Sequence, residues 1–219
     1  VHSEKLWRLA GGFLRFAPFE PAPVPVRGPR AGGFRFGSFN VLDKISPACW
    51  TVWRDILRAV PDSTLLLKSF ALKHPSAMAA WRRRLATEGL EGRVRLLPFV
   101  ESDAAHLALY GEVDLALDTA PYGGTTTTCE ALWMGVPILT LAGARHAGRV
   151  GASLLARVSD AGVVAEDWNA YRAAAIELAR DGAGYARLAD GLAARMRASA
   201  LADGDSLAAE MTAAFEAMT

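Results

Sequence analysis

From Gly33 onward, short apolar runs alternate with longer segments whose apolar residues recur every three or four positions. This alternation predicts an α/β fold with a parallel sheet, because parallel strands are joined by helical crossovers. Five strands are expected, over Phe34–Phe39, Thr64–Ser69, Arg93–Pro98, Asp114–Asp118 and Pro137–Leu141. With 52% hydrophobic and 21% charged residues, the composition excludes disorder, collagen and coiled coil.

Helices are expected between and after these strands, over Pro47–Val60, Pro75–Glu88, Asp103–Tyr110, Thr126–Met134 and Arg149–Val158. In the first of them Trp50, Trp53 and Ile56 recur at helical spacing, which favours a role in the core over a role in binding a cofactor. From Asp167 on, the pattern predicts no strand and two or three helices rich in alanine and arginine. Their breaks are expected at Gly182, Gly184, Gly191 and Gly204.

Five of the eleven prolines lie within residues 18–29, which predicts an extended linker. It divides the chain into residues 1–32, a tail of preceding structure with its linker, and a main domain over 33–219. Trp7 and Phe13 have little use in a free tail, and the chain begins with Val1. We therefore expect the sequence to be part of a longer protein.

Charge and cysteine content exclude several kinds of partner. The 24 Lys and Arg against 23 Asp and Glu provide no electrostatic attraction to nucleic acid or to a membrane surface. Neither a membrane-spanning run nor a signal peptide is visible. Cys49 and Cys129 are too few for a disulfide framework and belong to no metal-ligand pattern, so a reducing, cytoplasmic setting without a bound metal is expected.

The strongest local motif starts at Asp114 and runs through Asp118, two glycines and four consecutive threonines to Glu130. It predicts a strand, a glycine turn and a helix, and the free N–H groups of the helix start would face an anion such as phosphate. Both G-x-G-x-x-G and G-K-[ST] are absent, so the motif is neither a dinucleotide fingerprint nor a P-loop. Ordinary capping by Thr125 or Thr126 is the alternative.

Two charged residues extend this hypothesis. Lys44 is one of only four lysines, and it follows the first predicted strand and a turn that begins at Asn40. Ligands of open α/β sheets bind at the carboxyl ends of strands, so Lys44 and Asn40 are candidates for the same site. Glu130 lies in the first turns of the threonine helix, where a carboxylate can accept hydrogen bonds from ribose hydroxyls or simply complement the helix dipole.

Three further residues and one short pattern can each be interpreted in two ways. His106 is predicted on a helix and either stacks on a base or is a half-buried helix residue. His146 and Arg149 either face an anion or start a basic surface helix. Asp203-Gly-Asp205 matches the D-x-D pattern of metal-dependent glycosyl transfer, but its place between two alanine-rich helices favours capping.

The chain resembles the C-terminal catalytic half of the O-GlcNAc transferase family, in its bacterial, SPINDLY-like form, which tetratricopeptide repeats usually precede. The segments that carry the resemblance are Phe36–Pro47, Trp53–Ser63, Leu65–Lys68, Leu115–Asp118, Gly124–Pro137 and Arg145–Ser153. The resemblance implies a GT-B architecture of two Rossmann-like lobes, of which residues 33–219 would form the lobe that binds the UDP-sugar. Leu6–Phe16 resembles the tail of the other lobe.

By position, the resemblance assigns Lys44, Thr126 and Thr127 to the donor diphosphate, Glu130 to the uridine ribose and His106 to the uracil. It implies an inverting transfer, without a metal ion, from UDP-N-acetylglucosamine to serine or threonine hydroxyls of an acceptor protein. Lys44 and a helix N-terminus would stabilise the leaving diphosphate. Alone, this lobe is expected to bind UDP and to transfer little or nothing.

Three positions depart from the animal members of the family. Val41 replaces a glutamine, Asp103 a lysine and Thr125 a histidine, so each change removes a donor or reverses a charge. The sugar therefore stays open, because the plant SPINDLY branch uses fucose. A non-catalytic nucleotide-binding scaffold and a GT-B enzyme for small-molecule or lipid acceptors are the competing interpretations.

Overall fold

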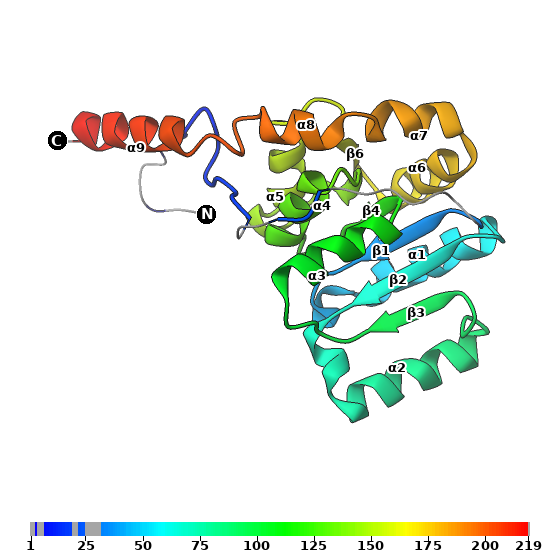
Figure 1. The fold of residues 1–219 in the computed structure, drawn as a ribbon. Coiled ribbons are helices and arrows are strands. Elements are labelled where there is room, and N and C mark those ends of the chain that lie inside the picture. The colour runs from blue at the N-terminus through cyan, green and yellow to red at the C-terminus, as the bar shows by residue number, and fades with distance from the viewer. Residues whose placement is uncertain (1–2, 4–6, 19–21, 25–31, 219) are drawn as a thin grey trace.

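The computed structural model describes residues 3, 7–18, 22–24 and 32–218. Its centre is a six-stranded parallel sheet in the order β3-β2-β1-β4-β5-β6 (Figure 1). The strands are β1 (Arg35–Ser38), β2 (Thr64–Lys68), β3 (Val94–Leu97), β4 (Leu115–Leu117), β5 (Ile138–Leu141) and β6 (Gly162–Ala165). Strand order reverses between β1 and β4, which lie side by side with Phe36 opposite Leu115.

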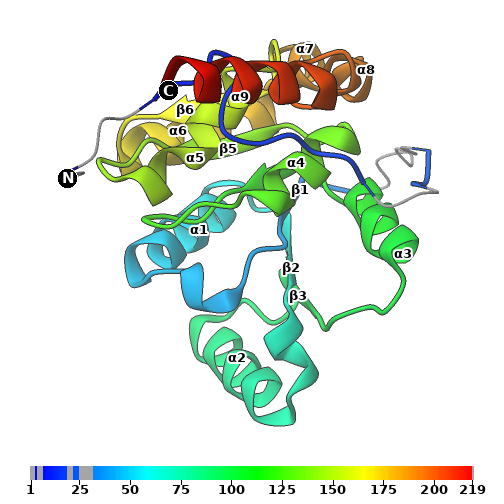
Figure 2. The same cartoon turned by 90° about the vertical axis from the view of Figure 1, so that its left-hand side faces the viewer.

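Helices cover both faces of this sheet, and Figure 2 shows α1 and α3 on opposite sides of it. The α-helices are α1 (Pro47–Ala59), α2 (Pro75–Glu88), α3 (Asp103–Ala108), α4 (Thr126–Trp133), α5 (His146–Leu155), α6 (Trp168–Arg180), α7 (Gly182–Ala189), α8 (Leu192–Arg197) and α9 (Gly204–Met218). Three 3₁₀ turns, η1 (Leu42–Lys44), η2 (Phe70–Lys73) and η3 (Leu109–Glu112), complete the elements.

The buried hydrophobic residues form two clusters. Trp50 and Trp53 of α1 are fully buried in the first, together with Tyr171 of α6, as their spacing predicts. The second cluster joins α4, α5 and α8 through residues such as Leu132, Leu154 and Met196. The Trp53 indole donates to Tyr171 Oη (3.3 Å), whose hydroxyl donates to the Asp118 carbonyl (2.9 Å), so the core reaches the end of β4.

The predicted strands and the bounds of α2 are confirmed, but the sheet has a sixth strand that the sequence analysis missed. β6 is only four residues long and pairs with β5, and a side chain at Gly162 would place its Cβ 1.9 Å from the Ile138 carbonyl oxygen. A glycine followed by two valines is too short a pattern to predict a strand without that neighbour.

The prediction of two or three C-terminal helices is wrong, because four helices follow Asp167. Gly184 lies within α7 and interrupts nothing, whereas Gly191 precedes α8 with a positive φ of 69°. The fifth predicted helix starts one turn earlier than expected, at His146. Of the proline-rich segment, Pro21, Pro25 and Pro29 fall outside the described residues, and so does the linker prediction for most of 18–29.

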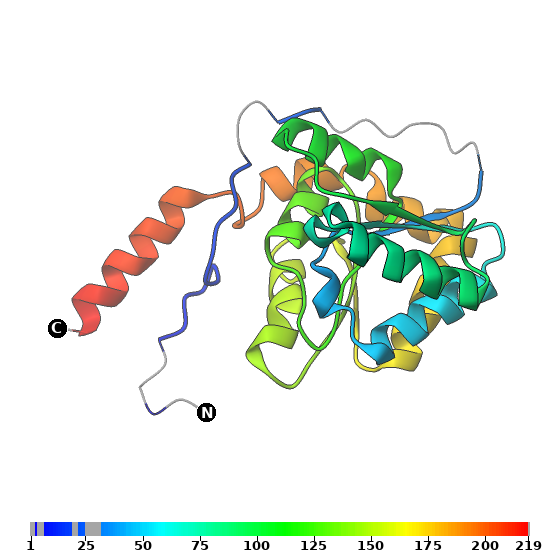
Figure 3. The same cartoon turned by 90° about the horizontal axis from the view of Figure 1, so that it is seen from below.

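Helix α9 extends away from the body of the domain, and the N-terminal segment runs beside its start (Figures 1 and 3). We call the described residues Trp7–Pro18 the N-terminal strap. The strap contacts α9 through a hydrogen bond from Gly11 N to Glu210 (3.1 Å). The strap therefore packs on a helix from the far end of the chain.

Candidate functional site

The candidate site lies at the carboxyl ends of β1 and β4, where the strand order of the sheet reverses. Open α/β sheets bind ligands at such a switch point, because the loops that follow the two strands diverge and leave a crevice. Here the loop after β1 carries Asn40, Lys44 and Ser46, and the loop after β4 carries the glycine turn. Ser46 Oγ joins the loops by donating to the Ala120 carbonyl (2.7 Å).

Asp118 organises the turn between β4 and α4. Its buried carboxylate accepts hydrogen bonds from Gly124 N (2.7 Å), Thr119 N (2.9 Å) and Thr140 Oγ1 (2.7 Å). Asn40 Nδ2 donates to the same carboxylate across the two loops (3.3 Å). Desolvation raises the pKa of Asp118, and these donors oppose that rise by stabilising the ionised form.

Gly124 allows the chain to approach its neighbours closely. A Cβ at this position would lie 2.5 Å from Thr127 Oγ1 and 3.0 Å from Asn40 Oδ1. Those two atoms are themselves hydrogen-bonded, with Thr127 donating to Asn40 at 3.1 Å. The glycine turn therefore packs the start of α4 directly against the loop after β1.

Lys44 reaches this turn from the loop after β1. Its Nζ donates to the Gly123 carbonyl at 3.1 Å and lies 3.9 Å from the centre of the Tyr122 ring. Neither partner is an anion, so the ammonium keeps its charge available. The structure thus brings Asn40, Lys44 and Gly124 together as the sequence predicts.

The first turn of α4 has no side-chain cap. Thr125 occupies the N-cap position, yet its hydroxyl accepts no hydrogen bond from the helix. This differs from α1, where Ser46 Oγ accepts from Cys49 N (3.2 Å). The capping interpretation of Thr125 is therefore wrong, and among the described residues no side chain satisfies the N–H groups of Thr126 and Thr127. These N–H groups, at the positive end of the helix dipole, are suited to an anion.

Glu130 forms the second half of the site, one turn further along α4. His106 Nε2 lies 2.9 Å and Tyr110 Oη 3.1 Å from Glu130 Oε2, while Oε1 has no hydrogen-bond partner among the described residues. Burial and the neighbouring Glu130 carboxylate raise the pKa of Tyr110, which stays a protonated donor. Glu130 Oε1 is left to accept a hydrogen bond from a ligand hydroxyl.

His106 fits the expected half-buried helix position and also lies within the site. Because Nε2 contacts a carboxylate, this nitrogen carries the proton, and Nδ1 is a buried atom without a partner among the described residues. Its ring lies 5.8 Å from the ring of Phe39, the residue that follows β1. A cavity of about 230 Å³ opens between His106, Glu130 and Thr126 on one side and the N-terminal strap on the other.

His146 and Arg149 are not part of this cluster. Both are exposed on α5 and line a separate cavity of about 490 Å³ with Arg8 and Phe13 of the strap. The start of α5 does touch the glycine turn, since Gly123 N donates to the Ala147 carbonyl (3.2 Å). Asp203 caps α9 by accepting from Ser206 N (3.0 Å), which confirms the capping interpretation of the D-x-D pattern.

Sequence reasoning missed three residues of the site: Asp118 as its organiser, Tyr110 as the partner of Glu130, and Lys68. Lys68 ends β2 with only 6% of its surface exposed, and no acceptor among the described residues lies within hydrogen-bond distance of its Nζ. The ring centres of Phe39 and Phe99 lie 5.9 Å and 5.7 Å from the Lys68 Nζ, and desolvation lowers the pKa of this lysine. The signal was a lysine that closes a run of three leucines.

The positions that depart from the animal family members lie on the loops and helices around this site. Val41 is exposed in the loop after β1, Asp103 begins α3 at the cavity, and Thr125 precedes α4. Within the described residues, no three His, Cys, Asp or Glu side chains gather in a way that could hold a metal ion. None of the described helices is both long and apolar enough to span a membrane.

The chain is similar in sequence to proteins of one known family. Residues 31–211 match the model of glycosyl transferase family 41. The chain is 41% identical over 220 residues to a rice protein named probable UDP-N-acetylglucosamine–peptide N-acetylglucosaminyltransferase SPINDLY. This match covers 99% of the chain and 24% of the rice protein, so the chain spans about a quarter of its curated relative.

Solved structures show the same fold. A mutant of the O-GlcNAc transferase from Thermobaculum terrenum superimposes with a TM-score of 0.82 at 35% identity, over 98% of this chain and 41% of that one. A sucrose-phosphate synthase from Thermosynechococcus elongatus matches in fold alone, with a TM-score of 0.62 at 16% identity over 85% of this chain and 45% of that one. The predicted fold, a Rossmann-like lobe of the GT-B kind, is confirmed.

Proposed function

The chain belongs to glycosyl transferase family 41, and on that premise we propose that it is the donor-binding lobe of a UDP-sugar-dependent protein O-glycosyltransferase. The proposed sugar is N-acetylglucosamine, which the names of the rice relative and of the Thermobaculum enzyme contain. The proposed acceptor is a serine or threonine hydroxyl of a protein.

One observation carries this proposal: an ammonium, an uncapped helix N-terminus and a carboxylate with a free oxygen meet at the switch point of the sheet. Lys44 and the first turn of α4 meet at Gly123 and Gly124, where a diphosphate would lie between them. Glu130, in the second turn, presents Oε1 to the next part of the ligand. This order of charges matches a nucleoside diphosphate, whose ribose hydroxyls are donors and whose phosphates are anions.

The chemistry follows from the leaving group. Attack of an acceptor hydroxyl on the anomeric carbon forms a C–O bond and breaks the bond from that carbon to the β-phosphate oxygen, with inversion. Negative charge then develops on the diphosphate. Lys44 and the α4 N–H groups would stabilise this charge in positions that Asp118 and Gly124 fix beforehand, so no reorganisation is needed during transfer. We propose that no divalent ion is required.

Lys68 supports the same reading from the end of β2. An enclosed lysine without a hydrogen-bond acceptor is unfavourable in the empty site, because burial penalises its charged form and the charge of Glu130 offsets this penalty only in part. A bound anion at the carboxyl edge of the sheet would offset that penalty. We therefore assign Lys68 to the positive field around the donor, in addition to Lys44.

Since the chain spans about a quarter of its curated relative, the remaining parts of the activity are proposed to lie elsewhere in a longer protein. They are an N-terminal catalytic lobe that supplies the acceptor side, including the base that removes the hydroxyl proton, and tetratricopeptide repeats before it. We propose a bacterial, cytoplasmic protein. By this assignment the 219-residue chain binds UDP and transfers no sugar by itself.

Calorimetric titration with UDP tests the proposal, in EDTA and again with Mg²⁺. We expect micromolar binding that does not depend on the metal. Lys44→Ala removes a charged donor and should weaken binding by about 1–3 kcal/mol, roughly 5- to 150-fold. Arg58→Ala is the matched control, because it removes one positive charge from an exposed side chain in the last turn of α1.

The outcomes separate the alternatives. Binding that needs Mg²⁺ would refute the metal-independent diphosphate site. No binding by a chain that circular dichroism shows to be folded would refute donor binding by this lobe and favour the scaffold interpretation. Equal losses in the Lys44 and Arg58 variants would mean that only net charge matters.

A further inference from the structure

The N-terminal strap forms one wall of the cavity at Glu130. Phe16, Ala17 and Pro18 line it from one side, and Asp103, His106 and Glu130 line it from α3 and α4. The family model matches residues 31–211, so the strap lies outside the matched range. Its place at the cavity comes from tertiary packing against α4 and α9.

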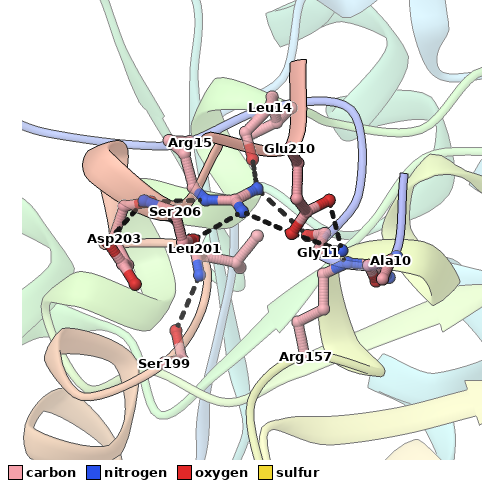
Figure 4. A network of polar contacts seen from close by, with 10 residues as sticks. All are labelled: Ala10, Gly11, Leu14, Arg15, Arg157, Ser199, Leu201, Asp203, Ser206 and Glu210. Carbon is pink, nitrogen blue, oxygen red and sulfur yellow. Dashed lines mark hydrogen bonds and ion pairs between the residues drawn. The ribbon is translucent and has the colours of Figure 1, made fainter. Parts of the chain in front are cut away.

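Arg15 fastens the strap to the end of the chain, as Figure 4 shows. Its guanidinium donates to the Asp203 carbonyl (2.7 Å) and to Ser206 Oγ (3.1 Å), and it lies 3.7 Å from Glu210 Oε1. It also donates to the strap's own carbonyls at Gly11 and Leu14 (both 3.1 Å). With 8% of its side chain exposed, Arg15 has its donors engaged and acts as a fastening, not as a ligand for an anion.

Further contacts at Phe16 and at Gly11 hold the strap on either side of Arg15. Phe16 N donates to the Leu201 carbonyl (2.7 Å), and the Phe16 ring meets Trp133 edge to face at 5.9 Å. Arg157 Nε donates to the Gly11 carbonyl (2.7 Å), and Glu210 accepts from Gly11 N (3.1 Å) (Figure 4). The position of Phe16 is thus fixed by α4, the turn after α5, α9 and the loop before α9.

The chemistry of the cavity differs between its walls. Arg15 also lines the strap side, but its donors are engaged within the strap and with the end of the chain, and the rest of that side is apolar, with one ring and one proline. The opposite side presents the His106 ring and the Glu130 carboxylate. A volume of about 230 Å³ is below the roughly 300–1,000 Å³ of sites that enclose a whole small ligand, so the cavity fits one part of a donor. A flat base with its ribose matches both walls, because bases stack on aromatic rings and ribose hydroxyls donate to carboxylates.

We infer that Phe16 and Pro18 contact the nucleoside of the bound donor and determine its affinity, and that Arg15 positions them from α9. This inference rests on the proposed function. It adds the strap to the nucleotide site, although the sequence divides residues 1–32 from the main domain. By this inference different residues bind the two parts of the donor: Lys44 binds the diphosphate and Phe16 contacts the nucleoside.

The experiment compares the affinities for UDP and for inorganic diphosphate, which lacks the nucleoside. The 219-residue chain is titrated with UDP, and diphosphate is then measured as a competitor. Phe16→Ala should weaken UDP about five- to tenfold, as expected for the loss of one stacking ring, and leave the affinity for diphosphate unchanged. Lys44→Ala should weaken both ligands. Phe16→Tyr keeps the ring and should keep the wild-type ratio of the two affinities.

Phe215→Ala is the matched control, since it removes an exposed ring from α9 that does not line the cavity. Arg15→Ala should reproduce the selective loss of UDP affinity in weaker form if Arg15 only positions the strap. Thermal melting of every variant shows whether it is folded. A strap with a merely structural role would lower the melting temperature of Phe16→Ala and leave the ratio of UDP to diphosphate affinity at the wild-type value.

Three results would overturn the inference. The first is an unchanged ratio in folded Phe16→Ala. The second is tighter UDP binding in that variant, which would show that the strap occludes the cavity. The third is a wild-type chain that binds no UDP, or that diphosphate does not compete for, which refutes the proposed function and the inference with it. UDP binding with an unchanged ratio refutes the inference alone.

Discussion

Charged side chains are paired differently at the two ends of the strands, which we call the amino edge and the carboxyl edge of the sheet. At the amino edge, Asp114 accepts three hydrogen bonds from Arg35, at 2.9, 3.1 and 2.9 Å. Arg93 there donates to the carbonyls of Ser63 (2.6 Å), Leu57 and Val60 (both 2.8 Å). At the carboxyl edge, Lys68 has no acceptor within hydrogen-bond distance among the described residues, and Lys44 has only a carbonyl.

The difference teaches which edge is built for stability and which for binding. A cavity of about 680 Å³ opens at the amino edge, larger than the one at Glu130, but the Arg35 and Arg93 side chains that line it already have partners. Among the described residues at the carboxyl edge, two lysines and the first N–H groups of α4 lack an anionic hydrogen-bond partner, while Glu130 Oε1 lacks a donor, so a ligand with both an anion and hydroxyl groups completes them. A choice by cavity size alone would place the site at the amino edge. The polar groups that lack hydrogen-bond partners indicate the carboxyl edge instead.

The largest expected effect tests the amino edge. Asp114→Ala leaves the Arg35 guanidinium without its carboxylate, and we expect the free energy of unfolding to fall by about 2–4 kcal/mol. The estimate lies below that for a fully buried pair, because 26% of the Arg35 side chain is exposed. Urea unfolding measures it. Glu112→Ala, which breaks the exposed pair with Arg95, should lose at most about 1 kcal/mol.

UDP affinity provides the second readout for this pair of variants. If the amino edge is only structural, folded Asp114→Ala should bind UDP as the wild type does. A selective loss of UDP affinity at a temperature where the variant is folded would break the comparison between the edges.

The next effect concerns the packed layer beneath the carboxyl edge. Burial raises the pKa of the Cys49 and Cys129 thiols from 9.0 to about 12. Between these values the unfolded chain loses the thiol protons first, so stability falls as pH rises from 9 to 12. By pH 10 the loss is about 1.4 kcal/mol for each thiol, or about 3 kcal/mol for both.

Urea unfolding at pH 8 and pH 10, in reducing buffer, measures this slope. The double variant Cys49→Ala, Cys129→Ala should be less stable at pH 8, because it leaves small cavities, and should lose less stability on going to pH 10. An equal slope in wild type and double variant would show that the thiols do not control the alkaline loss.

The smallest expected changes, in stability and in UDP affinity, concern Lys68 at the carboxyl edge. Lys68→Met keeps the long side chain and removes the charge, so we expect higher stability near neutral pH and UDP binding weaker by about 1 kcal/mol, roughly fivefold. Desolvation lowers the pKa of Lys68, so between that lowered value and 10.5 wild-type stability from this group rises with pH, and the variant lacks this rise. Denaturation and calorimetry measure the two changes.

Lys73→Met is the control, since Lys73 is exposed in η2 and belongs to no part of the site. It should alter neither quantity. A Lys68 variant that gains stability and keeps full UDP affinity would remove Lys68 from the donor site, while the assignment of Lys44 would stand.

Much of the candidate site could be predicted because its residues follow strands at the same edge. Lys44, Asn40 and the threonine turn each come after an apolar run, and parallel strands bring their carboxyl ends together. Tyr110 and Lys68 could not be assigned in this way. Each looks like an ordinary end of a helix or strand until Glu130 or Phe39 is placed beside it.

The sequence by itself determined the alternation of strands and helices, the bounds of α2 and the glycine turn, because periodicity, proline and glycine act within a few residues. Tertiary structure decided the contacts between distant residues: β6 exists beside β5, His146 lies apart from Glu130, and Gly11 meets Glu210 across a separation of 199 residues. Such contacts depend on how faces pack and leave no local pattern, so the wall that the strap builds at the cavity appears only in the folded chain.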